Sequence, residues 1–155
     1  MDFLTEERDG QGFVNWILSG DDAMSKWLVN LCEAERHGAI KFNNLIKVLI
    51  AKGLDPWLEL ELRRMQHQEA THYGLVKNVL EVRGLSEFRT EPWPESVNAM
   101  YMAERRAVMR FTTLIRNADK LDGDVYNIAH TILPDEAYHV VICQELIGRW
   151  GDLVI

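Results

Sequence analysis

The chain has 155 residues, of which 47% are hydrophobic and 26% are charged, and its formal net charge is -7. This length and composition are typical of one globular domain with a core of its own, and they exclude a low-complexity or disordered chain. The negative charge argues against nucleic acid and anionic membranes as general partners, although it is compatible with a local basic patch.

Neither a signal peptide nor a membrane span is predicted. The N-terminal sequence MDFLTEERDGQG lacks a basic region followed by an apolar run, and no stretch reaches the roughly 20 apolar residues that cross a bilayer. Cys32 and Cys143 stand singly in helical patterns, so no Cys-x-x-Cys metal site is predicted. We expect a cytoplasmic protein with reduced thiols and no membrane partner, folded as a single domain over residues 1–155.

Hydrophobic periodicity predicts a short N-terminal segment over residues 1–21 and a helical bundle over residues 22–150. In the bundle, apolar residues first recur three and four positions apart up to about Lys52, and Gly53 then ends this helix. A second helix is expected from Pro56, which suits a first turn, to about Arg83.

The second half of the bundle follows a long connection over residues 85–95. Pro92 and Pro94 stop a helix there and favour extended backbone. A third helix is expected over about residues 94–119 and a fourth over about residues 125–149. No run alternates with period two over enough residues to predict a strand, so the predicted fold class is all-α, with four long helices.

Two Glu-Ala-x-His motifs lie 67 positions apart, one in the second predicted helix and one in the fourth. The first comprises Glu69 and His72, and the second comprises Glu136 and His139. A carboxylate and an imidazole at i and i+3 lie on one face of a helix, about one turn apart. Each motif can therefore offer an oxygen and a nitrogen ligand to one point in space.

The first and third predicted helices carry a second repeat, AERHGAIKF over residues 34–42 and AERRAVMRF over residues 103–111. Each copy has Ala before its Glu and Phe seven residues after it, so the repeat pairs Glu35, not Glu33, with Glu104. A helical rise of about 1.5 Å per residue brings each of these glutamates level with the Glu-x-x-His motif of the next helix. The sequence therefore predicts a duplicated helix pair.

This pattern resembles the ferritin-like di-iron carboxylate superfamily, which includes rubrerythrins and bacterioferritins, in which two helices each give a Glu and two others each give a Glu-x-x-His. The resemblance covers residues 22–150. It implies a ferritin-like four-helix bundle built from two helix pairs, with a crossover between helices 2 and 3; spacing alone also allows a local turn there. The implied metal ligands are Glu35, Glu69, His72, Glu104, Glu136 and His139.

Carboxylate and imidazole donors suit two iron ions best, and they also suit manganese or a mixed Mn/Fe pair. In the family, an Asp before the Glu of a Glu-x-x-His often holds the opposite histidine by a hydrogen bond. Asp135 fits this role toward His72. The matching residue in the second helix is Gln68, which leaves the partner of His139 open.

The pocket beside the metals is expected to have Phe42 and Phe111 as matching walls, because apolar walls keep water from a reactive site. Cys32 and Cys143 are expected to line the bundle interior near the metals, and therefore the same pocket, as ordinary buried thiols. The remaining histidines fall off the metal face and are predicted to be surface or packing residues: His37, His67 and His130. No catalytic residue is predicted beyond the metal ligands.

The resemblance implies an oxidase or oxygenase that activates dioxygen or peroxide to oxidise or hydroxylate an organic substrate, with an external electron donor. The family's alternatives are a rubrerythrin-like peroxidase and an iron-binding ferroxidase. Rubrerythrins usually carry a four-cysteine module that is absent here, and cage-forming ferritins add a helix where only 16 residues follow His139. We therefore favour an oxygenase or oxidase.

The substrate and the partners are less constrained. A tRNA substrate stays open because the family includes tRNA-modifying enzymes, and an exposed acidic bundle is compatible with a homodimer. A metal-free structural bundle is the alternative from another class. It is disfavoured because ionisable groups that converge in a core cost several kcal/mol each unless they are paired or bind metal.

Overall fold

The computed structural model describes residues 8–92 and 94–155. The described part is all-helical, as predicted, and its helix boundaries lie within a few residues of the expected ones. The elements are α2 (Gln11–Ile17), α3 (Asp21–Ile50), α4 (Pro56–Val82), α5 (Val97–Arg116), the 3-10 helix η1 (Ala118–Lys120) and α6 (Gly123–Trp150). Residues 1–7 of the expected N-terminal segment and Trp93 of the expected connection lie outside the described residues.

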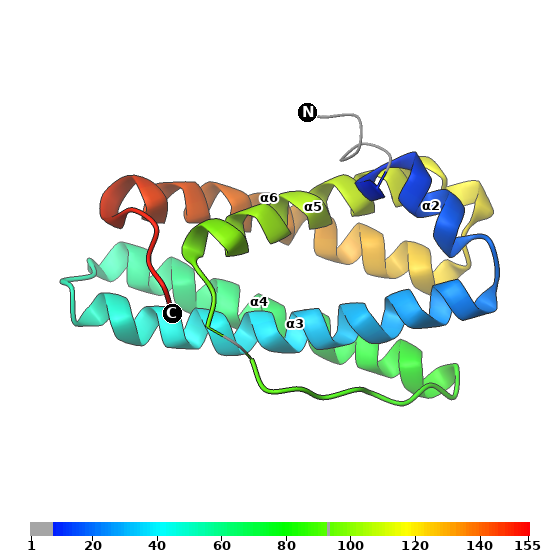
Figure 1. Ribbon diagram of the computed structural model, residues 1–155, viewed down its shortest axis with the longest axis horizontal. Coiled ribbons are helices and arrows are strands. Elements are labelled where there is room, and N and C mark those ends of the chain that lie inside the picture. Colours follow the sequence, from blue (N-terminus) through cyan, green and yellow to red (C-terminus); the bar gives the residue numbers. More distant parts are fainter. Residues whose placement is uncertain (1–7, 93) are drawn as a thin grey trace.

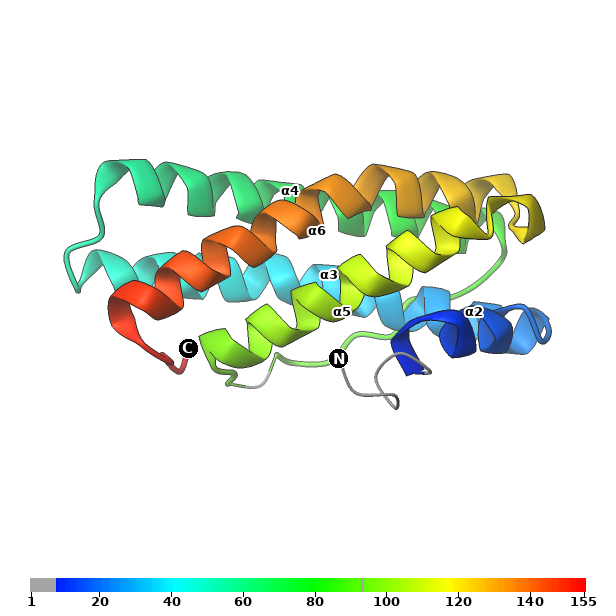
Figure 2. The ribbon, with the colours of Figure 1, turned by 90° about the horizontal axis from the view of Figure 1, so that it is seen from above.

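The long helices α3, α4, α5 and α6 lie side by side as a helical bundle (Figures 1 and 2). Helix α3 packs along α4, and α5 packs along α6, while α4 also contacts α6. The short helix α2 lies near one end of the bundle and contacts both α3 and α5. None of the helices in the described residues is long and apolar enough to cross a membrane.

Helix ends follow the capping signals of the sequence, with one shift. Asp55 caps α4 by accepting a hydrogen bond from the Leu58 amide at 3.0 Å. Helix α5 begins at Val97 and not near Pro94, because the Ser96 hydroxyl accepts a hydrogen bond from the Ala99 amide at 3.0 Å and caps the helix there.

The connection between α4 and α5 returns along the outside of α3 (Figure 1). The amide and hydroxyl groups of Thr90 donate hydrogen bonds to Glu33 Oε1, at 2.6 and 2.9 Å. Further along, Glu95 forms an ion pair with Lys41, about two turns after Glu33 on α3. The connection thus follows α3 in the direction of that helix, and α5 then runs back antiparallel to α3 and parallel to α4 (Figure 1).

The last residues of the chain pair with the start of α5, a contact that the sequence did not predict. Glu95 and Ile155 exchange backbone hydrogen bonds of 3.1 and 3.0 Å, and the Val97 amide donates to the Leu153 carbonyl at 2.8 Å. This short antiparallel contact fixes the end of the connection beside Lys41.

The apolar core is divided into two clusters along the bundle axis. One cluster includes Leu28, Val76 and Leu114, and the other includes Leu45 and Leu62. Between them, each long helix turns a polar segment toward the bundle axis, and this middle layer holds the candidate site.

Candidate metal centre

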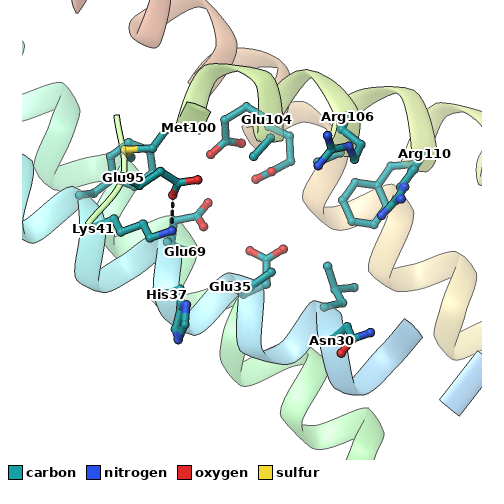
Figure 3. A pocket seen from close by; sticks show the side chains of 18 of the residues that line it. Asn30, Glu35, His37, Lys41, Glu69, Glu95, Met100, Glu104, Arg106 and Arg110 are labelled. Atoms are coloured by element: carbon teal, nitrogen blue, oxygen red, sulfur yellow. Dashed lines mark hydrogen bonds and ion pairs between the residues drawn. The ribbon is translucent and has the colours of Figure 1, made fainter. Parts of the chain in front are cut away.

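The side chains proposed as ligands all lie in the polar layer between the two apolar clusters. Each is at most 9% exposed, although each carries an ionisable group. Figure 3 shows the carboxylates of Glu35, Glu69 and Glu104 directed into one space from three different helices. The full set is Glu35, Glu69, His72, Glu104, Glu136 and His139.

Their donor atoms form two overlapping groups, each with all of its atoms within 4.8 Å of one another. Glu35 and His72 belong to the first group, whereas Glu104 and His139 belong to the second. Glu69 and Glu136 belong to both. The arrangement therefore offers two adjacent positions, each with three carboxylates and one imidazole, and two of the carboxylates are shared.

His72 presents one ring nitrogen to the cluster and the other to an outer carboxylate. Its Nδ1 lies 3.2 Å from Glu35 Oε2 and 3.5 Å from Glu136 Oε1. Its Nε2 lies 2.9 Å from Asp135 Oδ2, the partner proposed from the sequence. A proton on Nε2 that is donated to Asp135 leaves the Nδ1 lone pair available to a metal.

His139 has the same orientation, and Gln68 supplies its outer partner. His139 Nδ1 lies 3.1 Å from Glu69 Oε1, while its Nε2 lies 3.0 Å from Gln68 Oε1. The amide oxygen of Gln68 can only accept, so it selects the tautomer with the proton on Nε2. The Gln68 amide nitrogen also donates to Asp135 Oδ1 at 2.7 Å, which joins the two outer partners.

The ionisation of the cluster is strongly perturbed when no metal is bound. Burial, and then the negative charge of Glu69, raises the pKa of Glu35 to about 8. Burial and the other carboxylates also raise the pKa of Glu136 well above its usual range. Burial alone would lower the histidine pKa values, but nearby carboxylates outweigh it and raise them to about 10 for His72 and about 9 for His139. The metal-free cluster therefore retains protons at neutral pH.

Several polar atoms of the cluster are buried without a hydrogen bond from any described residue. These are Glu69 Oε1, Glu104 Oε2, Glu136 Oε1 and His139 Nδ1. Buried polar atoms in proteins are nearly always satisfied, and each exception needs an explanation. All four belong to the second donor group, so one cation placed there would satisfy them together.

Gly38 on α3 makes room for the shared carboxylate of Glu69. A β-carbon at position 38 would lie 2.0 Å from Glu69 Oε2, far inside van der Waals contact. The corresponding residue of the sequence repeat is Ala107, three positions after Glu104. The two halves of the cluster are therefore not equivalent, and Glu69 occupies space that only glycine leaves free.

Comparison with family models, curated proteins and solved structures finds no match.

A cavity of about 340 Å³ lies between α3 and α5 and reaches the carboxylates of the cluster (Figure 3). Phe42 and Phe111 both line it, as expected from the repeat. The Phe42 ring meets the His139 ring edge to face, with ring centroids 5.5 Å apart. Trp27 and Leu31 extend the apolar wall.

Cys32 and Cys143 are not among the residues that line this cavity, contrary to expectation. Each is buried in one of the two apolar clusters. Cys32 lies about one helical turn from Glu35 on α3, and Cys143 lies about one turn from His139 on α6, so both are outside the polar layer. Burial, and then nearby glutamates, raises the pKa of Cys32 to about 11 and raises that of Cys143 further above its ordinary value. Neither cysteine belongs to the two donor groups of the cluster.

The other predicted side chains lie largely as expected. Glu33 points away from the cluster and accepts hydrogen bonds from Arg36 at 2.9 Å. His37 is buried beside Glu33 and Thr90, and its Nε2 atom lies 2.9 Å from Glu33 Oε1. His37 also lines the cavity. His67 and His130 are exposed.

The sequence analysis missed the charged residues that line the cavity, chiefly Lys41, Glu95, Arg106 and Arg110. A signal for the arginines was present in the sequence. Within the bounds of α5, Val97–Arg116, Glu104 is the only acidic residue, yet the helix contains four arginines. With Glu104 turned inward as a ligand, the remaining charge of that helix is wholly positive.

Proposed function

We propose that the chain is a ferritin-like di-iron protein that activates dioxygen or peroxide to oxidise or hydroxylate an organic substrate. The observation that carries this proposal is the pair of overlapping donor groups, each of three carboxylates and one imidazole, at the base of a cavity. Two bound iron ions would supply the electrons for oxygen activation, and an external donor would restore them. Manganese or a mixed Mn/Fe pair also suits these donors.

The charge of the cluster supports two divalent ions. Four buried carboxylates in one layer repel one another, and without cations they can be accommodated only by retaining protons. Two divalent ions carry a charge equal and opposite to that of the four carboxylates. They would also satisfy the donor atoms that make no hydrogen bond in the described structure.

The surrounding residues have separable roles in this proposal. Asp135 and Gln68 accept the Nε2 protons of the two histidines and so hold both Nδ1 atoms toward the cluster. Phe42 and Phe111 keep water from the metal side of the cavity. The cavity volume falls in the range of small-molecule sites, about 300–1,000 Å³, which favours an organic substrate over storage of iron.

The proposal is tested by measuring metal content in a matched pair of variants. We expect the wild-type chain to bind about two metal ions, one for each donor group. Glu35→Ala removes a donor and is expected to lower the bound metal by at least about half. Glu33→Ala, two residues away, is expected to keep the wild-type stoichiometry. Loss of metal in Glu33→Ala with retention in Glu35→Ala would refute the ligand assignment.

A second measurement separates an oxygenase from a storage protein of the same superfamily. Ferrous iron is added stepwise in air, and the iron oxidised per chain is followed by absorbance. An oxygenase is expected to stall near the capacity of its two donor groups, whereas a storage protein continues to oxidise added iron. Continued oxidation over many ions per chain would replace the proposed function by a ferroxidase.

A further inference from the structure

Three arginines converge on one buried carboxylate at the edge of the cavity. Asp9 is 3% exposed, and it lies 3.6 Å from Arg8 Nε, 3.5 Å from Arg106 Nε and 3.1 Å from Arg110 Nη2. Arginine keeps its charge over the whole physiological pH range. Three positive charges therefore face a single negative one.

Arg106 and Arg110, two of the arginines that contact Asp9, also line the cavity, whereas Asp9 itself does not. Arg106 Nε is buried and makes no hydrogen bond to any described residue. Burial lowers the pKa of Arg110; Asp9 opposes this shift, and the neighbouring Arg106 and Arg8 add to it. Arg106 and Arg110 both line the cavity on the α5 side, at the end away from Lys41 (Figure 3).

The other charges of the cavity are balanced close to where they lie. Lys41 pairs with Glu95 at the opposite end (Figure 3). The four cluster carboxylates are balanced when two divalent ions are bound, as the proposed function requires. An incoming molecule then meets an apolar wall that includes Phe111, Leu31 and Trp27, with excess positive charge at one end.

We propose that the organic substrate is a carboxylic acid whose carboxylate binds Arg106 and Arg110 and whose apolar body lies along Phe111 toward the carboxylate cluster. The inference rests on the proposed function for its reaction, but binding of the acid can be tested separately. Guanidinium groups bind carboxylates through paired N–H donors and so fix orientation as well as affinity. Arg106 and Arg110 are positioning residues in this proposal, because the reacting end of the molecule lies near the cluster.

The test compares octanoate with its neutral analogue octanamide by calorimetry on the iron(II)-loaded protein kept free of oxygen. We expect octanoate to bind at least about tenfold more tightly than octanamide, as for a charge-assisted contact. Arg106→Gln and Arg110→Gln should each remove most of this preference by weakening octanoate binding, with a much smaller effect on octanamide binding. The matched control is Arg116→Gln, an exposed arginine of α5 that does not line this cavity and should not alter either affinity.

Asp9→Asn provides a test in the opposite direction. If the arginines bind the substrate, removal of the competing carboxylate should strengthen octanoate binding, while octanamide binding stays the same. If the arginines serve only to hold Asp9, the variant should bind octanoate no more tightly than the wild type. That result, or an octanoate preference that persists in both arginine variants, would overturn the proposal.

Metal content measured on the same samples keeps the two proposals distinct. A wild-type chain that binds no metal contradicts the proposed function. A chain that binds metal but does not distinguish octanoate from octanamide contradicts the substrate class alone.

Discussion

At the scale of single residues, the cluster depends on Gly38, which has no side chain. Gly38 leaves space for Glu69, the carboxylate that belongs to both donor groups. Glycine in a helix interior costs about 0.5–1 kcal/mol relative to alanine, and at position 38 this cost accompanies the space left for Glu69. The sequence analysis did not single out this position, because the space that the glycine leaves is visible only in the structure.

We expect Gly38→Ala to weaken metal binding without unfolding the protein. The added methyl group displaces Glu69 Oε2, which would otherwise lie 2.0 Å from it, so both donor groups lose their shared ligand position. The metal dissociation constant, measured by competition with a chelator, should rise at least about tenfold, the lower end of effects on supporting residues. Gly74→Ala is the control, because nothing lies within 4 Å of the added carbon, and it should keep metal affinity.

The outer partners of the histidines lead to a second prediction at this scale. In Asp135→Asn, an amide group would face both His72 Nε2 and the Gln68 amide nitrogen, which donates at 2.7 Å to the native carboxylate. Asparagine has only one amide oxygen, so its NH₂ group would face either the Gln68 NH₂ group or the His72 Nε2–H group, and two donors would meet. His72 could avoid this only by moving its proton to Nδ1, the atom that faces the cluster. Metal affinity should fall by about 10- to 100-fold. The exposed Asp119→Asn makes the same charge change and should have no effect; equal behaviour of the two variants would contradict the role of Asp135.

At the scale of elements, α3 supports both the cluster and the connection that crosses it. Glu35 faces inward, while Glu33 faces outward and accepts hydrogen bonds from Arg36 and from both donor groups of Thr90. The hydrogen bonds from Arg36, opposed by burial and reinforced by those from Thr90, lower the pKa of Glu33 to about 2. Glu35 therefore belongs to the candidate metal site, whereas Glu33 stabilises the fold.

Glu33→Ala is expected to lower the free energy of unfolding by about 1–3 kcal/mol, because Thr90 and Arg36 lose a charged hydrogen-bond partner. A lowered carboxylate pKa stabilises the fold above the ordinary value of 4.5, and this contribution is lost as the pH falls toward about 2. The free energies of unfolding of wild type and Glu33→Ala, measured in urea on the metal-free proteins, should therefore differ at pH 7, and this difference should shrink below pH 4.5. Glu59→Ala, which breaks a partly exposed pair with Arg63, should cost less at every pH.

The elements themselves were largely predictable from the sequence, for identifiable reasons. Apolar periodicity and terminal signals such as Asp55, Pro56 and Gly53 act locally, so they located the helices. The backbone contact between Glu95 and Ile155 was not predictable, since it joins segments far apart in the chain and uses only main-chain groups. The start of α5 was placed near Pro94 in the prediction, whereas the Ser96 side chain caps the helix and Val97 begins it.

At the scale of the whole molecule, the net charge of -7 conceals a separation of charge. The candidate ligands could be found because two repeats independently selected them, and helical geometry makes i and i+3 neighbours. The arginines around Asp9 could not be assigned in this way. Asp9 lies before α2 and meets Arg106 and Arg110 only because α2 packs against α5, a contact that carries no local sequence signal.

The protons retained by the metal-free cluster should make the stability of the whole molecule depend on metal and pH together. Glu35 at about 8, His72 at about 10 and His139 at about 9 all have pKa values above those of the unfolded chain, which are near 4.5 for Glu and 6.5 for His. The folded metal-free state therefore binds more protons than the unfolded state across this range. A raised pKa stabilises the fold below the unfolded value, and this contribution is lost as the pH rises through the folded value.

We expect the melting temperature of the metal-free protein, measured by calorimetry with a chelator, to fall between pH 6.5 and pH 9, the window set by these pKa values. Metal binding replaces the same protons, so manganese(II) affinity should rise over this window and binding should release protons to the buffer. The gap between loaded and metal-free melting temperatures should therefore widen as the pH increases. His67→Gln, which removes an exposed histidine from α4, should leave this dependence unchanged. A melting temperature of the metal-free protein that stays constant or rises over the window would mean that the cluster holds no such protons, and the electrostatic case for two cations would fail with it.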